Sequence, residues 1–202
     1  MTLLGKIVKI GLGKIFHFLL GEMFQMFRKI KYFLISDNRC TKNEARFFQP
    51  AIFSGYGSIS IGASTIGVIK SPFYHSSYCY LEARSQESSI VIGNNSFFNN
   101  NLTIIADKTN IIIKDNCLFG PNLSIYDSDF HEIDPKNRNS GNQLCAPVII
   151  EENVFIGSNV TILKGITIGR NSVIASGSVV ANSIPENVIA GGVPAKVLKS
   201  IN

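Results

Sequence analysis

The sequence has little charge and few of the residue types that form disulfides and metal sites. Charged residues make up 16% of the 202 positions, and apolar residues make up 45%. A disordered chain shows the reverse balance, so we expect one sizeable folded domain with an appendage. The four cysteines lie far apart without a C-x-x-C pair, and the three histidines are scattered. We therefore predict a reduced, cytoplasmic protein with no disulfide framework and no metal.

Most of the chain also lacks excess positive charge. Residues 1–36 contain six basic side chains and one acidic side chain, a net charge of +5. The rest of the chain holds 13 of the 19 basic and 13 of the 14 acidic side chains, so its formal charges cancel. Because a nucleic-acid-binding body needs a basic surface, we expect no nucleic-acid partner.

Residues 1–36 predict a basic amphipathic helix, or two shorter helices, because four glycines interrupt the segment. Apolar residues recur at steps of three and four from Leu4 to Leu34, and Lys6 and Lys9 are among the polar residues opposite. The longest charge-free apolar run is too short to span a bilayer and has no cleavage site after it. Two interpretations stay open. The helix lies on an anionic membrane, or it packs on the main domain or a sister subunit.

The C-terminal half lacks the apolar spacing of a long amphipathic helix or of a long strand. Instead, an aliphatic residue returns at every sixth position. The set is Ile150, Ile156, Ile162, Ile168, Ile174 and Val180. A six-residue step scatters side chains around a helix, and one strand of that length exceeds the usual range of about 3–10 residues. The chain must therefore bend repeatedly and keep one inward aliphatic in each straight stretch. The same step recurs upstream at Ile92, Phe98 and Ile104, and at Ile113, Phe119 and Ile125.

Glycine and asparagine mark the bends. Asn often follows the aliphatic by three positions, as at Asn153 and Asn159, and both residue types tolerate left-handed backbone angles. Three short strands per turn, stacked on the next turn, predict an all-β solenoid. We expect it over residues 58–184 with an inserted loop at 126–149. A connecting segment at 37–57 precedes it, and a tail at 185–202 follows.

This hexapeptide pattern and the tail VIAGGVPAKVLKSI (188–201) resemble the hexapeptide-repeat acyltransferases, in particular the galactoside/maltose and polysaccharide O-acetyltransferase branch. The resemblance covers about residues 58–201. It implies a left-handed parallel β-helix, acetyl-coenzyme A as co-substrate, and a homotrimer with active sites between subunits. In that arrangement His131 and Asn99 would face Ser158 and Ser176 of a neighbour.

The polar loop at 126–146 contains His131 among acidic residues. Structureless loops of this length are usually functional or disordered, and such a histidine taken alone is more often a solvated surface group. Members of the family carry their catalytic histidine on this loop, so the resemblance implies that His131 is the general base. A neutral imidazole suits proton removal from a sugar hydroxyl. Asp129, Glu132 or a backbone carbonyl could orient the ring, and these alternatives stay open.

The resemblance also implies residues that bind the acceptor. Asn99 matches an asparagine that hydrogen-bonds the acceptor sugar, and Asp107 matches a sugar-binding aspartate. Ser85 or Arg84 are further candidates for the acceptor pocket. The alternative for Asn99 is an asparagine ladder at a corner of the solenoid.

For the donor, Ser158 and Ser176 match coil positions that contact the acetyl-bearing arm of coenzyme A. Lys196 and Lys199 match basic residues that meet the phosphates of the cofactor, to which cations are suited. Asn182 stands where relatives have a basic residue, so Lys164 is a candidate replacement. Small residues at corners and solvated lysines in a tail are the alternative interpretation.

The expected function is acetyl-coenzyme A-dependent O-acetylation of a sugar or surface polysaccharide. We expect direct transfer because no Cys or Ser lies in a nucleophile motif. One alternative is N-acetylation of a nucleotide-linked amino sugar, in which His131→Ala would leave most activity. Another is a non-catalytic β-helix scaffold or binding module. A membrane-binding helix would place the enzyme at the inner face of a bacterial cell membrane.

Overall fold

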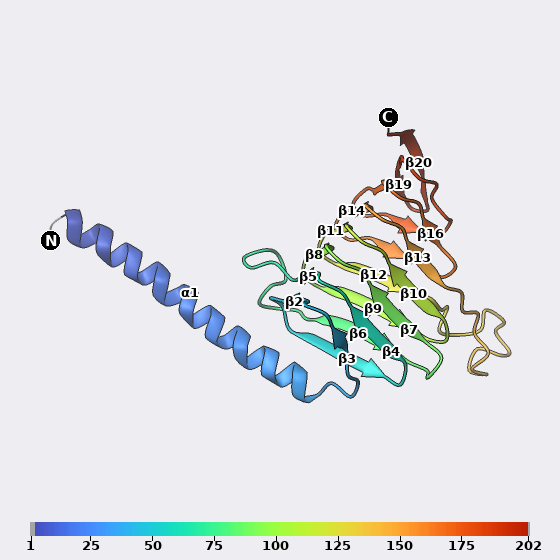
Figure 1. Cartoon of the computed structure of the whole chain (residues 1–202), viewed down its shortest axis with the longest axis horizontal. Helices are drawn as coiled ribbons and strands as arrows, with labels where there is room; N and C mark the ends of the chain where they lie inside the picture. Colours follow the sequence, from blue (N-terminus) through green and yellow to red (C-terminus); the bar gives the residue numbers. More distant parts are fainter. Residues whose placement is uncertain (1–2, 202) are drawn as a thin grey trace.

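A computed structural model describes residues 3–201 of the chain, with side chains described over residues 11–201. It is a three-sided prism of stacked strands from which one long helix projects (Figure 1). The helix, α1 (Leu3–Leu34), is continuous rather than divided in two. The predicted helix positions Leu4, Lys6 and Lys9 lie outside the described side chains. No helix within residues 3–201 is long and apolar enough to cross a membrane.

The prism has three parallel sheets, as the six-residue period predicts, and forms a left-handed β-helix. Sheet A contains β1 (Thr41–Lys42), β4 (Ser58–Ile61), β7 (Ser89–Ile92), β10 (Asn110–Ile113), β13 (Val148–Ile150) and β16 (Thr167–Ile168). Sheet B contains β2 (Arg46–Phe47), β5 (Thr65–Ile66), β8 (Phe97–Phe98), β11 (Leu118–Phe119), β14 (Phe155–Ile156), β17 (Val173–Ile174), β19 (Val188–Gly192) and β20 (Ala195–Ser200). Sheet C contains β3 (Ala51–Gly55), β6 (Cys79–Ala83), β9 (Leu102–Ala106), β12 (Leu123–Tyr126), β15 (Thr161–Ile162) and β18 (Val179–Val180).

The core is a set of ladders in which each coil places its aliphatic residue on that of the next coil. In sheet A the ladder runs through Ile61, Ile92, Ile113, Ile150 and Ile168, all of which are at most 2% exposed. In sheet B the rings of Phe98 and Phe119 stack with their centroids 4.3 Å apart. Burying each such side chain stabilises the fold by about 1.5–3 kcal/mol, so the stack of coils supplies a core that one coil lacks.

Asparagines do occupy the corners in left-handed conformation. Asn153, Asn159 and Asn171 have φ angles of 56°, 57° and 59°. Their side chains also bond from coil to coil. The Nδ2 group of Asn153 donates to Oδ1 of Asn171, and Nδ2 of Asn171 donates to Oδ1 of Asn187. Asparagine therefore serves both the backbone angle and the stacking of the corners.

The solenoid begins earlier than the repeat predicts. The expected connecting segment, 37–57, contains β1, β2 and β3, which pair in parallel with β4, β5 and β6. A second difference is an unpredicted excursion at residues 67–78, between β5 and β6, which contacts α1. At the other end, β19 extends sheet B and β20 folds back antiparallel to it. The tail of the chain thus covers the last coil.

Candidate functional site

One corner of the prism, where the chain passes from sheet C to sheet A, gathers several of the predicted residues. We call it the histidine edge and define it as residues 84–88, 107–109 and 127–147. These segments follow β6, β9 and β12 respectively. Because these three strands are neighbours in sheet C, their ends meet along one edge. Arg84, Ser85, Asp107 and the loop with His131 are therefore close in the fold although they are far apart in the sequence.

The ring of His131 is exposed and is held by a backbone carbonyl. Its Nδ1 atom lies 3.2 Å from the carbonyl oxygen of Arg138, seven residues further along the loop. A carbonyl oxygen only accepts hydrogen bonds, so this contact places the proton of the neutral ring on Nδ1. The lone pair of Nε2 is then free to accept a proton. Of the three groups that could orient the ring, namely Asp129, Glu132 and a backbone carbonyl, only the carbonyl forms a hydrogen bond with it among the described residues.

The acids beside His131 have other positions. Oδ1 of Asp129 accepts a hydrogen bond from Nζ of Lys164 at 2.7 Å, and Glu132 is half-buried. Neither acid bonds to the histidine ring within the described residues. Lys164, the candidate replacement for a phosphate-binding residue, is therefore paired with Asp129 at the base of the loop.

The carboxylate of Asp107 anchors the loop instead of facing open solvent. It is 3% exposed. Oδ2 accepts hydrogen bonds from Nε2 of Gln143 and, at 3.2 Å, from Oγ of Ser128. Oδ1 lies 3.5 Å from Nη1 of Arg84. Burial alone would raise the pKa of Asp107, but these hydrogen bonds and the Arg84 charge hold it below its ordinary value of 3.8. Asp107 therefore binds both ends of the loop as an anion.

Two neighbours of Asp107 complete the histidine edge. The guanidinium of Arg84 pairs with Glu82 at 3.0 Å and lies over the ring of Phe130, 5.2 Å from its centroid, so it supports the residue before His131. The Oγ atom of Ser85 is buried without a hydrogen-bond partner among the described residues. An unpaired buried hydroxyl is energetically costly.

A second corner, where the chain passes from sheet B to sheet C, holds a different set of predicted residues. We call it the serine edge and define it as residues 99–101, 120–122, 157–159 and 175–177. Ser158 and Ser176 stack on consecutive coils there, and the N–H of Ser158 donates to Oγ of Ser176 at 3.0 Å. Asn99 follows β8 at the same corner, and its Oδ1 accepts the N–H of Asn100 at 2.8 Å.

Asn99 is therefore not placed as the resemblance implied. The predicted arrangement put Asn99 with His131, opposite the two serines of a neighbour. In the structure Asn99 shares the serine edge with Ser158 and Ser176 of its own chain, because β8, β14 and β17 lie in one sheet and end at one corner. His131 lies at the next corner, across sheet C.

The tail lysines lie beyond the serine edge. Both Lys196 and Lys199 are exposed on β20, opposite Gly191 and Ile189 of β19. Ala190 of β19 accepts the N–H of Ala175 at 2.8 Å, so this hairpin continues the coil that carries Ser176. Lys196 is the nearer of the two lysines to the corner, since its partner Gly191 is next to the end of β19 on that side.

None of the four thiols is an activated nucleophile. Burial raises the pKa of Cys79 to about 12 and those of Cys40 and Cys117 to about 11. Burial also raises the pKa of Cys145, which lies beside Asp107. A thiol of high pKa is a poor nucleophile at neutral pH. The imidazole of His131 is therefore better suited to activate a substrate than to activate a cysteine.

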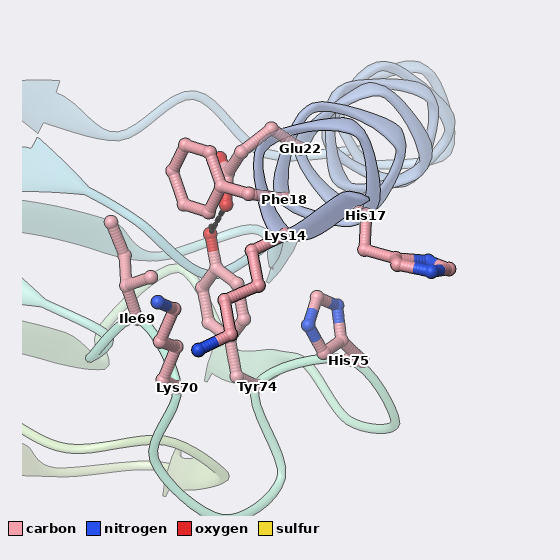
Figure 2. A pocket seen from close by; sticks show the side chains of 9 residues that line it. Lys14, His17, Phe18, Glu22, Ile69, Lys70, Tyr74 and His75 are labelled. Atoms are coloured by element: carbon pink, nitrogen blue, oxygen red, sulfur yellow. Dashed lines mark hydrogen bonds between the residues drawn. The ribbon is translucent and has the colours of Figure 1, made fainter. Parts of the chain in front are cut away.

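Another hollow lies between α1 and the excursion at 67–78. The excursion adjoins the serine edge, because Nδ2 of Asn100 donates to the carbonyl of Val68 at 2.9 Å. The hollow has a volume of about 350 Å³ and is lined in part by Lys14, His17, Lys70 and His75. Figure 2 shows Lys14 and Lys70 directed into it and the hydroxyl of Tyr74 bonded to Glu22. The hydrogen bonds of Glu22 and Gln25 to Tyr74, beside this hollow, fix which side of α1 faces the prism.

The chain is similar to acetyltransferases of known fold. Residues 147–182 match a family model described as the hexapeptide repeat of succinyl-transferase. The galactoside O-acetyltransferase of Escherichia coli K12 is 45% identical over 118 residues, 58% of this chain and 57% of that protein. Nodulation protein L of Rhizobium meliloti is 38% identical over 143 residues, 71% and 70% of the two chains.

A solved structure supports the same relationship. The galactoside acetyltransferase in complex with coenzyme A has a TM-score of 0.53 and 26% identity, and the match covers 90% of this chain and 82% of that one. The chain spans between 57% and 63% of the length of the first curated relatives that it matches.

Proposed function

The chain belongs to the hexapeptide-repeat acetyltransferase family, and from this premise we propose that it transfers an acetyl group from acetyl-coenzyme A to a hydroxyl of a sugar. The observation that carries the proposal is the loop of the histidine edge, where the Arg138 carbonyl holds His131 with Nε2 free. The E. coli relative is a galactoside O-acetyltransferase by name, which supports a sugar acceptor.

In the proposed reaction Nε2 of His131 accepts the proton of the sugar hydroxyl while the oxygen attacks the thioester carbonyl carbon. The new C–O bond forms as the carbonyl becomes a tetrahedral oxyanion. Collapse breaks the C–S bond, and the departing thiolate takes the proton back from the imidazolium. The products are an acetyl ester and free coenzyme A. The carbonyl of Arg138 stabilises the imidazolium because it accepts a hydrogen bond from Nδ1–H throughout.

We place the donor on the serine edge and the tail. Ser158 is half-buried, Ser176 is exposed, and both lie on successive coils where an extended pantetheine arm can run along the prism. Lys196 continues the same line and is suited to the phosphates, with Lys199 behind it. For the acceptor we assign Asn99 as the contact, and we place Ser85, whose hydroxyl is buried, beneath the histidine edge.

This assignment requires two chains. A face of the prism is about five residues wide, or roughly 16 Å at ~3.3 Å per residue, so His131 and the serine edge of one chain do not converge. We propose a homotrimer in which the histidine edge of one subunit meets the serine edge of the next. Asn99 then joins His131 of the neighbour and not of its own chain.

The outer surface of sheet B supports such an interface. Phe97, Leu118 and Phe155 pair in register on β8, β11 and β14, and they are 39%, 50% and 46% exposed. A continuous apolar ladder on the outside of a solenoid is unfavourable in water unless another surface covers it. Because this ladder adjoins the serine edge, a subunit packed on it is positioned to bring its own histidine edge alongside.

The acceptor class is the finer part of the proposal. We propose a hydroxyl of a surface polysaccharide or oligosaccharide unit because the loop that carries His131 is exposed at a corner of the prism. The direct test is acetyl transfer from acetyl-coenzyme A to a panel of galactosides, maltose and host polysaccharide, read by mass spectrometry of the acceptor.

Wild-type protein is expected to form an alkali-labile ester, and His131→Ala is expected to lower kcat by about 10²–10⁴-fold. An alkali-stable amide on an amino sugar, with His131→Ala retaining most activity, would favour the N-acetyltransferase alternative. Failure to bind acetyl-coenzyme A in calorimetry would favour the scaffold.

A further inference from the structure

Helix α1 has two very different sides. One side faces the excursion at 67–78, where Nε2 of Gln25 donates to the carbonyl of Tyr74 at 2.7 Å and the ring of Tyr32 stacks on Tyr78 at 4.6 Å. Gln25 is only 1% exposed, so this contact is well packed. The helix is thus fixed to its own prism through polar and aromatic contacts.

The opposite side is an apolar ridge that is exposed along most of its length. Ten side chains at helical steps of three and four have exposed fractions between 42% and 73%, namely Leu12, Ile15, Phe16, Leu19, Met23, Met26, Phe27, Ile30, Phe33 and Leu34. We call these ten residues the ridge. Phe33, at its C-terminal end, lines a hollow with Phe47 and Phe53 of the first coil. The N-terminal half of α1 extends beyond the stacked coils (Figure 1).

The charges around the ridge are almost all positive. By helical geometry Lys29 and Lys31 border it on its two long sides. The one acid of the described part of α1, Glu22, is bonded to the hydroxyl of Tyr74 at 3.0 Å on the packed side (Figure 2). A helix with an apolar face, cationic flanks and too few consecutive apolar residues to span is typical of one that lies in the plane of a membrane interface.

We propose that the ridge lies in the surface layer of an anionic lipid bilayer and attaches the base of the prism to it. A second copy of the chain is the competing occupant. Pairing two ridges would bring Lys29 and Lys31 of both copies together, and the rest of the chain has no surplus of acidic residues to offset them. Anionic lipid headgroups supply the missing negative charge along both flanks.

The test is co-sedimentation of the full chain with vesicles of phosphatidylcholine containing about one-third phosphatidylglycerol. Leu19→Glu places a charge in the ridge, at a side chain 60% exposed. Its matched control is Tyr56→Glu, which adds the same charge at a side chain 83% exposed outside α1. We expect the control to pellet like wild type and Leu19→Glu to lose about tenfold or more in vesicle binding.

Two further arms separate lipid binding from the other outcomes. Lys29→Gln with Lys31→Gln is expected to weaken binding to anionic vesicles about tenfold and to leave the weak binding to neutral vesicles unchanged. Pelleting without vesicles and thermal melting control for aggregation and unfolding, and Phe27→Gln provides a second, uncharged change in the ridge.

The proposal fails if Leu19→Glu and Tyr56→Glu pellet alike. It also fails if Leu19→Glu lowers the mass of the assembly in solution but not vesicle binding, because the ridge is then an interface between copies. Neither result depends on acetyl transfer.

Discussion

At the scale of single residues, the geometry around His131 rests on groups that no short motif contains. The carbonyl that holds its ring belongs to Arg138, and the carboxylate that anchors its loop belongs to Asp107, 24 positions before the histidine in the sequence. The loop could be found from the interrupted repeat, and the resemblance to the family singled out His131 within it. Their partners could not, because a backbone carbonyl has no sequence signature and a buried aspartate is indistinguishable from a sugar-binding one.

Asp107 is expected to act as a positioning residue for the loop. Asp107→Asn removes the negative charge that accepts hydrogen bonds from Gln143 and Ser128 and pairs with Arg84. Hydrogen exchange of residues 127–146 should then speed up at pH 7, and kcat should fall about tenfold with KM for acetyl-coenzyme A little changed. Glu186→Gln, at a distant exposed carboxylate, is the matched control. A rise in KM for the acceptor, with unchanged loop exchange, would instead identify Asp107 as a sugar contact.

The pH dependence of this anchor follows from the lowered pKa of Asp107. A carboxyl whose pKa is lower in the folded state stabilises the fold above its unfolded value, and the contribution is lost as pH falls through the folded value. The loop of wild-type protein should therefore stay protected from neutral pH down to about 4 and open only below that. Hydrogen exchange over a pH series measures this. Opening between pH 5 and 7 would contradict it, as would a variant Asp107→Asn that opens at the same pH as wild type.

At the scale of elements, the six-residue period predicts the coils because their inward aliphatic residues and Asn corners repeat together. The first coil was missed for a physical reason. It fills its interior with Phe47 and Phe53, whose rings meet edge to face at 5.8 Å, so it carries no aliphatic repeat. The excursion at 67–78 was missed because it has no repeat either and is ordered by contacts with α1.

The corners allow a stability test at Asn171, where φ is 59°. Asn171→Ala forces a Cβ-bearing residue without a local hydrogen bond into left-handed conformation and breaks the ladder between Asn153 and Asn187. We expect the free energy of unfolding to fall by about 1–2 kcal/mol. Asn171→Gly loses the same side-chain hydrogen bonds, but glycine adopts the left-handed conformation without strain. Its free energy of unfolding should therefore fall by less. Urea denaturation measures both, and equal losses would show that the ladder alone matters.

At the scale of the whole molecule, we propose that the active site forms between two chains. The apolar ladder on sheet B is the expected contact between subunits. Leu118→Glu, at its centre, should convert trimer to monomer in light scattering and abolish acetyl transfer, with the β-helix retained in circular dichroism. Val91→Glu, at a side chain 39% exposed on sheet A, is the matched control and should remain trimeric. An active Leu118→Glu monomer would show that one chain suffices.

Complementation between two inactive variants tests the central claim most directly. His131→Ala spoils the histidine edge and Asn99→Ala spoils the serine edge, so each homotrimer should be nearly inactive. When the two chains are mixed in equal amounts and assembled together, about one quarter of the sites should join an intact His131 from one chain to an intact Asn99 from the other. The account predicts recovery of roughly that fraction of wild-type activity in the mixture. Activity no higher than the average of the two separate variants would contradict it.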